Sequence, residues 1–311
     1  MRILVTGGAG FLGSALANAL AREGHEVLVL DDLSAGDQTR LDAKVFFHRG
    51  EITNRPKLWT LLQGVQCVYH LAARVLVAES ILYPREYNDV NVGGTVALLE
   101  AMRDVGVPRL VFTSSGAVYG AQVEQPVSES TTPNPQSPYA VSKLAAEYYV
   151  HTIGALWGTT TVALRIFNAY GPGQPLLPSH SPVIPRFVYQ ALGGGSLVIF
   201  GSGEQTRDFV YVDDVVRALI AAATAPDVAR RTINVGSGED TSIQTLAQHV
   251  LTLTGSSSNI INSPVKSGGV VRLRSDVSLA RQVLGYEPKV PLLEGLQRTL
   301  AEDRRFKRGR D

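Results

Sequence analysis

A cluster of glycines near the start of the chain constrains its fold more than any other feature. An apolar run, Ile3 to Val5, leads into Gly7-Gly8-Ala9-Gly10-Phe11-Leu12-Gly13, and the stretch Ser14 to Arg22 is typical of a helix. Glycine allows the tight turn, the close approach of backbone to a pyrophosphate and the direct packing of helix on strand. The N–H groups at the start of such a helix attract phosphates. We therefore expect a dinucleotide-binding turn in which Gly7, Gly10, Phe11, Leu12 and Gly13 contact the cofactor.

An acidic pair at the end of the second apolar run indicates which dinucleotide this is. The run Glu26 to Leu30 ends at Asp31-Asp32. An acidic residue about 20 residues beyond the glycine turn is typical of a dinucleotide site. A carboxylate there accepts hydrogen bonds from a ribose 2′-hydroxyl and would repel a 2′-phosphate. We expect NAD rather than NADP, with Asp31 and Asp32 beside the ribose.

Strand-like and helix-like stretches alternate along the first half of the chain, which predicts an α/β fold with a doubly wound parallel sheet of the Rossmann type. The expected strands are Arg2–Val5, Glu26–Leu30, Lys44–His48, Cys67–Leu71, Arg109–Thr113 and Thr160–Arg165, and the expected helices are Phe11–Arg22, Arg55–Leu62, Tyr87–Val105 and Tyr139–Trp157.

Proline and glycine become dense in residues 171–182, which predicts a long loop that leaves the sheet. A helix, Asp213–Thr224, and a strand, Thr232–Val235, are expected to return to it. We therefore expect an NAD-binding domain of residues 1–166 and 208–236. A smaller α+β substrate domain of residues 167–207 and 237–311 would lie over the carboxyl ends of the strands.

Composition excludes several classes of function. A net charge of +1 gives no sign of a nucleic-acid or membrane partner, and the apolar runs are too short to span a bilayer. The single Cys67 has no disulfide partner and reads as a buried strand residue. The six histidines have no metal-ligand spacing, so no metal is expected. Because the first strand begins at Arg2, leaving no room for a signal peptide, we expect a cytoplasmic protein.

Three residues carry the expected chemistry: Ser115, Tyr139 and Lys143. Tyr139 and Lys143 are four residues apart in a predicted helix and so share one face. A phenol is a poor base at neutral pH, and a neighbouring ammonium lowers its pKa towards a usable value. Ser115 follows the fifth predicted strand and can hold the same substrate hydroxyl. We expect Tyr139 to be the general base, with Lys143 also reaching the nicotinamide ribose.

Together these motifs resemble the extended short-chain dehydrogenases/reductases of the nucleotide-sugar branch, most closely the UDP-glucose (UDP-galactose) 4-epimerases. The resemblance covers nearly the whole chain. The matching segments are Tyr69–Ala73, Asn88–Thr95, Phe112–Gly120, Arg165–Pro172, Val198–Gly201, Thr206–Asp214 and Leu284–Leu296.

The resemblance implies roles for further residues. Glu51 and Ile52 would lie near the adenine, where the family usually has Asp followed by an aliphatic residue. Leu71, Ala72 and Ala73 would line the cofactor, and Asn91 would lie beside the active site. Asn168 and Arg207 would hold the diphosphate of a UDP-sugar, Phe200 would lie against the uracil, and Arg272, or alternatively Lys266, would supply a second cation. A homodimer would form through the helices Asn88–Val105 and Tyr139–Trp157.

Two small residues narrow the reaction. The related 4,6-dehydratases carry an Asp and a Glu that remove water across C5 and C6, and this chain has Gly116 and Ala117 in those places. Neither can move a proton. What remains is oxidation at C4 with NAD, rotation of the 4-keto sugar and return of the hydride to the opposite face.

The identity of the sugar stays open. Relatives that act on UDP-glucuronate tend to carry arginines where this chain has Pro175, which favours neutral sugars, although Arg186 or His180 could approach from the same loop. Leu273 falls near a position that limits room for a 2-acetamido group. The alternatives are a UDP-glucuronate or UDP-N-acetylhexosamine 4-epimerase, and a non-catalytic NAD-binding sensor.

Overall fold

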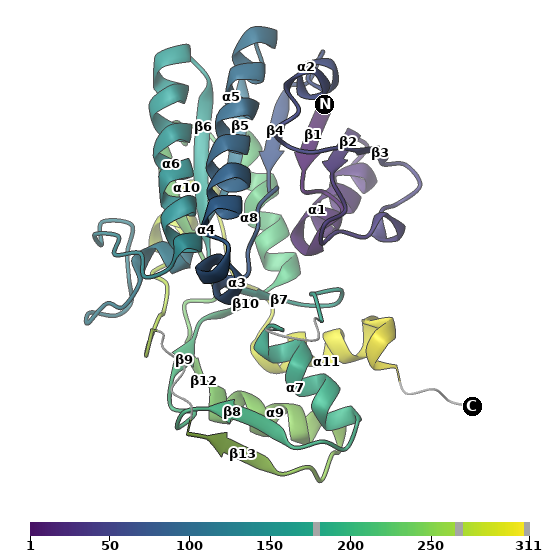
Figure 1. Ribbon diagram of the computed structural model, residues 1–311, viewed down its shortest axis with the longest axis vertical. Helices are drawn as coiled ribbons and strands as arrows, with labels where there is room; N and C mark the ends of the chain where they lie inside the picture. Colours follow the sequence, from purple (N-terminus) through teal and green to yellow (C-terminus); the bar gives the residue numbers. More distant parts are fainter. Residues whose placement is uncertain (177–180, 265–269, 308–311) are drawn as a thin grey trace.

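The structure is a computed structural model that describes residues 1–176, 181–264 and 270–307. It contains a large lobe built on a seven-stranded sheet and a smaller lobe below it (Figure 1). The sheet has the order β11-β6-β5-β4-β1-β2-β3 with all neighbours parallel. Its strands are β1 (Arg2–Thr6), β2 (Glu26–Asp31), β3 (Phe46–Arg49), β4 (Cys67–His70), β5 (Arg109–Ser115), β6 (Thr160–Ile166) and β11 (Arg231–Val235). The predicted doubly wound α/β fold is confirmed.

Helices cover both faces of this sheet. The helices α1 (Phe11–Arg22) and α8 (Val212–Thr224) pack together on one face. The helices α2 (Arg55–Leu61), α5 (Gly94–Val105) and α6 (Pro138–Trp157) cover the other. Because both faces are covered, the central strands are apolar in their middle, as in β1, where Ile3, Leu4 and Val5 are fully buried. Cys67 is likewise buried, in β4.

The segment before α5 differs from its prediction. One continuous helix was expected over Tyr87–Val105. The structure has α3 (Val77–Leu82), α4 (Pro84–Asn88), a π-helical turn η2 (Asp89–Gly93) and then α5. A π-helical turn inserts a residue into the helical repeat and often marks a functional site. Here it turns Asn91 into the interior, where the side chain makes the contacts described below.

The smaller lobe is made of short elements. Strands β8 (Leu197–Phe200) and β13 (Ile260–Ser263) pair in parallel, beside α7 (Val183–Leu192) and α9 (Ile243–Thr254). The pairs β7 (Asn168–Tyr170) with β10 (Phe209–Tyr211) and β9 (Thr206–Arg207) with β12 (Thr241–Ser242) link it to the sheet lobe. Helices α10 (Ser278–Leu284) and α11 (Leu292–Glu302) complete the chain, with 3₁₀ turns at Gln38–Arg40, Gly116–Tyr119 and Arg304–Phe306. The exact division into two domains stays a prediction.

In the parts of the chain that the structure describes, no helix is long and apolar enough to cross a membrane.

Candidate active site

The glycine turn between β1 and α1 has the shape of a dinucleotide cradle. Gly7 has a φ of 69°, and a Cβ built on it would lie 2.6 Å from the backbone nitrogen of Ala72. A Cβ on Gly13 would overlap the carbonyl oxygen of Gly7. Gly10 caps α1 without a side chain, so the first N–H groups of the helix are left for a ligand. Phe11 and Leu12 begin the helix and are half-buried. These residues fit the pyrophosphate of NAD.

Asp31 lies at the end of β2, next to this turn. Its carboxylate accepts hydrogen bonds from the backbone N–H groups of Ala9 at 3.0 Å and Leu33 at 2.8 Å. Burial raises the pKa of Asp31, and these backbone hydrogen bonds oppose the shift. Asp32, in contrast, is exposed and accepts hydrogen bonds from the backbone and hydroxyl of Ser34. Asp31 is therefore the carboxylate that is fixed against the glycine turn.

Two further segments meet at the same edge of the sheet. Ile52 is buried against α5, where a Cβ on Gly94 would overlap its side chain, and the neighbouring Glu51 is exposed. Leu71, Ala72 and Ala73 follow β4, and the N–H of Leu71 donates to the carbonyl of Thr6. The glycine turn, the loop after β2 and the loop after β4 thus lie side by side, as a dinucleotide site on an open parallel sheet requires.

Asn91 joins the loop after β4 to helix α6. Its side-chain oxygen accepts from the backbone N–H of Arg74 at 2.8 Å, and its Nδ2 donates to the carbonyl of Arg74 at 3.0 Å. The same Nδ2 lies 2.9 Å from the hydroxyl of Ser142, which stands between Tyr139 and Lys143 in the sequence. Asn91 therefore fixes the loop against the helix that carries the expected catalytic residues.

Helix α6 brings Tyr139 and Lys143 to the carboxyl end of β5, where Ser115 lies. Two residues fix the start of this helix: Ser137 accepts a hydrogen bond from the N–H of Ala140, and Pro138 occupies the first turn. The side chains of Ser115 and Tyr139 are close enough to interact, and the Ser115 hydroxyl favours the ionised form of the phenol, which lowers its pKa. Ser115 also caps the 3₁₀ turn η3 (Gly116–Tyr119), since its Oγ accepts from the N–H of Ala117 at 3.2 Å.

The electrostatics of Tyr139 differ from the expectation. Burial raises the pKa of the Tyr139 phenol in this structure, and the Ser115 hydroxyl opposes the shift. Burial also lowers the pKa of Lys143 to about 7, against the opposing charge of Glu147. The ammonium of Lys143 lies 4.4 Å from the centre of the Phe112 ring. Desolvation of the phenol therefore sets the net direction of the Tyr139 pKa shift, opposite to the expected lowering.

Three residues near this group escaped the sequence analysis. The ring of Tyr87 packs edge-on against that of Tyr139, with centroids 6.5 Å apart. His70 is buried below Lys143, with its two ring nitrogens 2.7 Å and 2.9 Å from the hydroxyls of Thr6 and Thr95. Burial lowers the pKa of His70 to about 3. Glu147 lies one helical turn beyond Lys143, and this spacing of four residues was the signal that could have identified it from the sequence.

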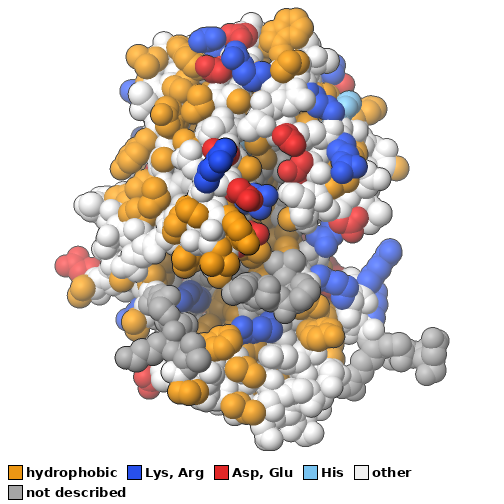
Figure 2. Space-filling view, in the orientation of Figure 1, with side chains coloured by type: hydrophobic (Ala, Val, Ile, Leu, Met, Phe, Trp, Pro, Cys, Tyr) orange, Lys and Arg blue, Asp and Glu red, His pale blue; other side chains and the backbone are white. Residues whose placement is uncertain are grey.

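The residues expected to bind the substrate lie in the smaller lobe or at its junction with the sheet. Asn168 begins β7 and its side chain is exposed. Phe200 ends β8 and is 39% exposed. Arg207 ends β9, and burial lowers its pKa. Figure 2 shows Lys and Arg side chains along the junction between the two lobes.

Arg272 is held by another residue. Its Nε lies 2.8 Å from a carboxylate oxygen of Asp240, which also accepts from the hydroxyl of Thr206. The N–H of Thr206 donates to the carbonyl of Val271, which brings the segments of Arg207 and Arg272 together, but Arg272 is exposed and paired with Asp240. The alternative cation, Lys266, and the loop residue His180 lie outside the described residues. Leu273 is buried in a cluster with Tyr119 and Phe167, next to the η3 turn.

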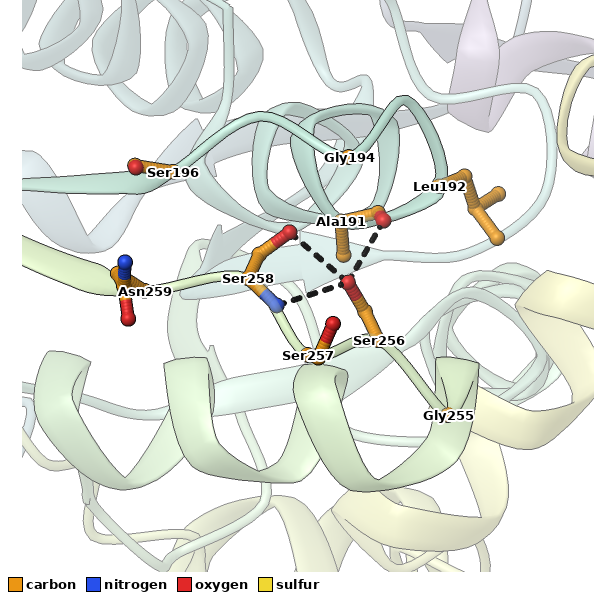
Figure 3. A pocket seen from close by; sticks show the side chains of 9 residues that line it. All are labelled: Ala191, Leu192, Gly194, Ser196, Gly255, Ser256, Ser257, Ser258 and Asn259. Carbon is orange, nitrogen blue, oxygen red and sulfur yellow. Dashed lines mark hydrogen bonds between the residues drawn. The ribbon is translucent and has the colours of Figure 1, made fainter.

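A separate pocket in the smaller lobe lies between the ends of α7 and α9 (Figure 3). It has a volume of about 340 Å³, and its lining residues carry no ionisable side chain. The hydroxyl of Ser256 donates to the carbonyl of Ala191 at 2.9 Å, and it lies 2.9 Å from the hydroxyl of Ser258. Ser256 and Ser258 satisfy one another, and no residue that lines the pocket supplies an acid or a base that would activate a serine hydroxyl.

Comparison with known proteins agrees with this geometry. The model of the NAD dependent epimerase/dehydratase family matches residues 3–236. The UDP-glucose 4-epimerase of Mycolicibacterium smegmatis is 38% identical in an alignment of 307 positions that covers 96% of this chain and 97% of that protein.

Two crystal structures are similar along nearly their whole length. The UDP-glucose 4-epimerase of Thermotoga maritima with UDP-glucose is 35% identical, with a TM-score of 0.93 over 97% of this chain and 98% of that one. The UDP-glucose 4-epimerase of Thermus thermophilus in complex with NAD is 33% identical, with a TM-score of 0.90 and the same coverage. On the family match and these identities, the chain belongs to the NAD dependent epimerase/dehydratase family.

Proposed function

We propose that this protein is an NAD-dependent nucleotide-sugar 4-epimerase that interconverts UDP-glucose and UDP-galactose. One observation carries the proposal. Ser115, Tyr139 and Lys143 are assembled at one end of the sheet, and the positions directly after Ser115 hold Gly116 and Ala117. The site thus has the groups for reversible oxidation of an alcohol, without an acid–base pair for elimination at those positions.

The glycine turn and Asp31 support NAD as the cofactor. Gly7, Gly10 and Gly13 leave room that a Cβ would fill, and Asp31 offers a fixed carboxylate to the ribose. Asp32, Glu51, Ile52, the segment Leu71–Ala73 and Asn91 would complete the site. Bound there, NAD supplies a hydride acceptor and donor.

In the proposed reaction, Tyr139 takes the proton of the C4 hydroxyl and later returns one to the C4 oxygen. Ser115 holds that oxygen through its hydroxyl. The ammonium of Lys143 stabilises the phenolate that Tyr139 becomes during the transfer. The sugar turns between the two steps, so the same three residues serve both faces of C4.

Gly116 leaves little room for a larger side chain. A Cβ on Gly116 would lie 3.2 Å from the ring of Phe167, so a larger residue at this position would require the ring to shift slightly. Ala117 is half-buried at the start of the same turn. This packing supports a reaction confined to C4 over a dehydratase.

On the substrate side, Arg207 and Asn168 would bind the diphosphate and Phe200 the uracil. The guanidinium of Arg207 donates to the carbonyl of Thr206, and among the described residues no ion pair involves Arg207. A half-buried cation of this kind is suited to a phosphate. Arg272 would bind the diphosphate only after its ion pair with Asp240 is broken. A UDP-glucuronate or UDP-N-acetylhexosamine is the alternative substrate.

We also propose that the protein is a homodimer formed through α5 and α6. Helix α6 exposes several large apolar side chains, and exposed apolar patches often mark contact sites. They are Val141, Tyr148, Tyr149 and Leu156. Light scattering after size-exclusion chromatography would measure the oligomeric state. The cytoplasmic location stays a prediction.

The experiment that tests the function is a panel of UDP-sugars incubated with the purified protein and no added cofactor, with products identified by NMR. We expect interconversion of UDP-glucose and UDP-galactose, because the retained NAD is regenerated in each turnover. Exclusive turnover of a uronate or an N-acetylhexosamine would select the alternative. Binding of NAD without turnover of any sugar would indicate a sensor.

A further inference from the structure

Behind the proposed catalytic group lies a buried ion pair that the reaction described above does not use. Glu147 in α6 and Arg165 in β6 are only 2% and 4% exposed. The Nη2 of Arg165 donates to Oε1 of Glu147 at 2.6 Å, and its Nε donates to Oε2 at 3.1 Å. Burying two charges costs free energy that such a bidentate contact only offsets. The pair is therefore a poor source of stability, and its position suggests another use.

Glu147 connects helix α6 to the three strands β5, β6 and β11. Ser114, the neighbour of Ser115 at the end of β5, donates its hydroxyl to Oε2 of Glu147 at 2.6 Å. Thr232 in β11 donates to Oε1 at 3.3 Å. The carboxylate is thereby fixed between β5, β6 and β11, and it fixes α6 relative to the strand that carries Ser115.

Lys143 is the residue on which this carboxylate acts. It lies four residues before Glu147 on the same helix, so the two side chains are on one face. Lys143 is 3% exposed. An ammonium so deeply buried tends to lose its proton, and a nearby carboxylate opposes that tendency. Burial lowers the pKa of Lys143 to about 7, and the charge of Glu147 acts in the opposite direction.

Other groups around Lys143 do not replace Glu147. His70 from β4 faces it, and because burial lowers the pKa of His70 to about 3, that ring is neutral near pH 7. The ring of Phe112 from β5 faces the ammonium, and Tyr139 lies one turn earlier on α6.

On the side away from Lys143, Glu147 faces Arg165 and also His151, and burial lowers the pKa of His151.

Arg165 in turn packs on the ring of Tyr119, with Cζ 4.7 Å from the centroid. The hydroxyl of Tyr119 donates to Asn234, whose N–H donates to Glu129. Arg230 also acts on His151. Tyr119 thus packs on Arg165, and Glu147 is the carboxylate whose charge acts on both His151 and Lys143.

We propose that Glu147 is a positioning residue for Lys143: its carboxylate, one helical turn away and fixed by Ser114 and Arg165, keeps the Lys143 side chain charged beside Tyr139. The proposal rests on the proposed function for its catalytic meaning, since only the ammonium form of Lys143 stabilises the Tyr139 phenolate. Its physical content, the protonation state of Lys143, can be measured without any substrate.

The test is an NMR titration of the lysine side-chain methylene signals in the purified full-length protein with its bound NAD. The Lys143→Met variant identifies the signal. We expect Glu147→Gln to lower the titration midpoint of Lys143 by about one pH unit or more, because the amide carries no charge. Thr232→Val is the matched control: it removes a hydrogen bond to Glu147 but keeps both charges, and it should leave the midpoint unchanged.

Activity provides a second readout. In Glu147→Gln, the decline of kcat at high pH should begin at lower pH, because Lys143 loses its proton earlier, while KM changes little. Should Glu147→Gln fail to fold, Glu147→Asp retains the charge but withdraws it by one methylene, and it should shift the midpoint in the same direction by less. A midpoint unchanged from wild type in the folded variants overturns the proposal. A shifted midpoint in a protein that turns over no UDP-sugar supports the positioning role and refutes the proposed function instead.

Discussion

On the side of the seven-stranded sheet, the charged groups of the site lie beside protein groups that offset their charge, whereas two half-buried arginines of the smaller lobe, Arg186 and Arg207, donate to backbone carbonyls and form no ion pair with a described residue. Asp31 accepts two backbone hydrogen bonds, and Lys143 lies one turn from Glu147. Among the described residues, ion pairs involve neither Arg186 nor Arg207, although burial lowers the pKa of each. The guanidinium of Arg186 instead faces the ring of Phe200, with Cζ 5.2 Å from the centroid.

This difference separates two kinds of site. A catalytic group has to be positioned before the substrate arrives, and fixed hydrogen bonds do this at no further cost in each turnover. A site for an anionic ligand needs cations whose partner is the ligand itself. Substitutions on the sheet side should therefore lower kcat or NAD binding, and substitutions in the smaller lobe should raise KM.

The largest effect is expected at Tyr139. Tyr139→Phe removes the proton acceptor but keeps the ring against Tyr87, so turnover should fall by roughly two to four orders of magnitude while NAD binding remains. Single-turnover kinetics with UDP-galactose and fluorescence titration with NAD would measure the two quantities. Turnover near the wild-type rate would remove Tyr139 from the mechanism.

At Arg207 the effect should appear in KM. Arg207→Gln loses charge-assisted hydrogen bonds to the diphosphate, which corresponds to a rise in KM of roughly tenfold to a hundredfold. Steady-state kinetics with UDP-glucose would measure it. Arg272→Gln is the comparison, and a smaller change is expected because Arg272 is already paired with Asp240. A larger effect at Arg272 than at Arg207 would reverse their roles.

At Asp31 the expected change is in cofactor choice. Asp31→Ala removes the acceptor for the 2′-hydroxyl and the repulsion of a 2′-phosphate, so NAD should bind about tenfold more weakly and NADP relatively better. Isothermal titration calorimetry on the cofactor-stripped protein would measure both. The exposed Asp32 serves as control, since Asp32→Ala should change the ratio less. Tighter binding of NADP than NAD by the wild type would contradict the assignment.

The smallest effect concerns stability in acid. Folding lowers the pKa of His70 from an ordinary value near 6.5 to about 3, so the stability that the neutral ring contributes is complete above about pH 6.5. It is lost as the pH falls towards 3, by about 1 to 2 kcal/mol between pH 6.5 and 5. His70→Asn should flatten this part of the curve, as measured by urea unfolding at several pH values. Parallel curves for the two proteins would exclude His70 as the cause.

Sequence alone predicted the parts of the site that lie within one turn or one helix. The glycine turn spans seven residues, and Tyr139 and Lys143 are neighbours on one helix, so spacing was enough. The central fold followed from the alternation of buried strands and helices. Contacts between distant segments could not be read in this way.

The Glu147–Arg165 pair is an example, because it joins a helix to a strand and nothing in the spacing of the two residues marks the contact. The pairing of Arg272 with Asp240 is another. The net direction of the Tyr139 pKa shift could not be read from spacing for a related reason. Spacing shows which charges are near, but the desolvation that raises this pKa depends on everything packed around the phenol.

The most direct test of the central claim, a reaction confined to C4, is epimerisation in deuterated water. UDP-galactose incubated with the protein should yield UDP-glucose with its C6 hydroxymethyl group intact and no deuterium at C5, because Gly116 and Ala117 provide no base there. Substrate deuterated at C4 should keep its label, since the hydride returns to the same carbon. Deuterium at C5, or a 4-keto-6-deoxy product, would show an elimination or enolisation that this site is not built to perform and would contradict the account.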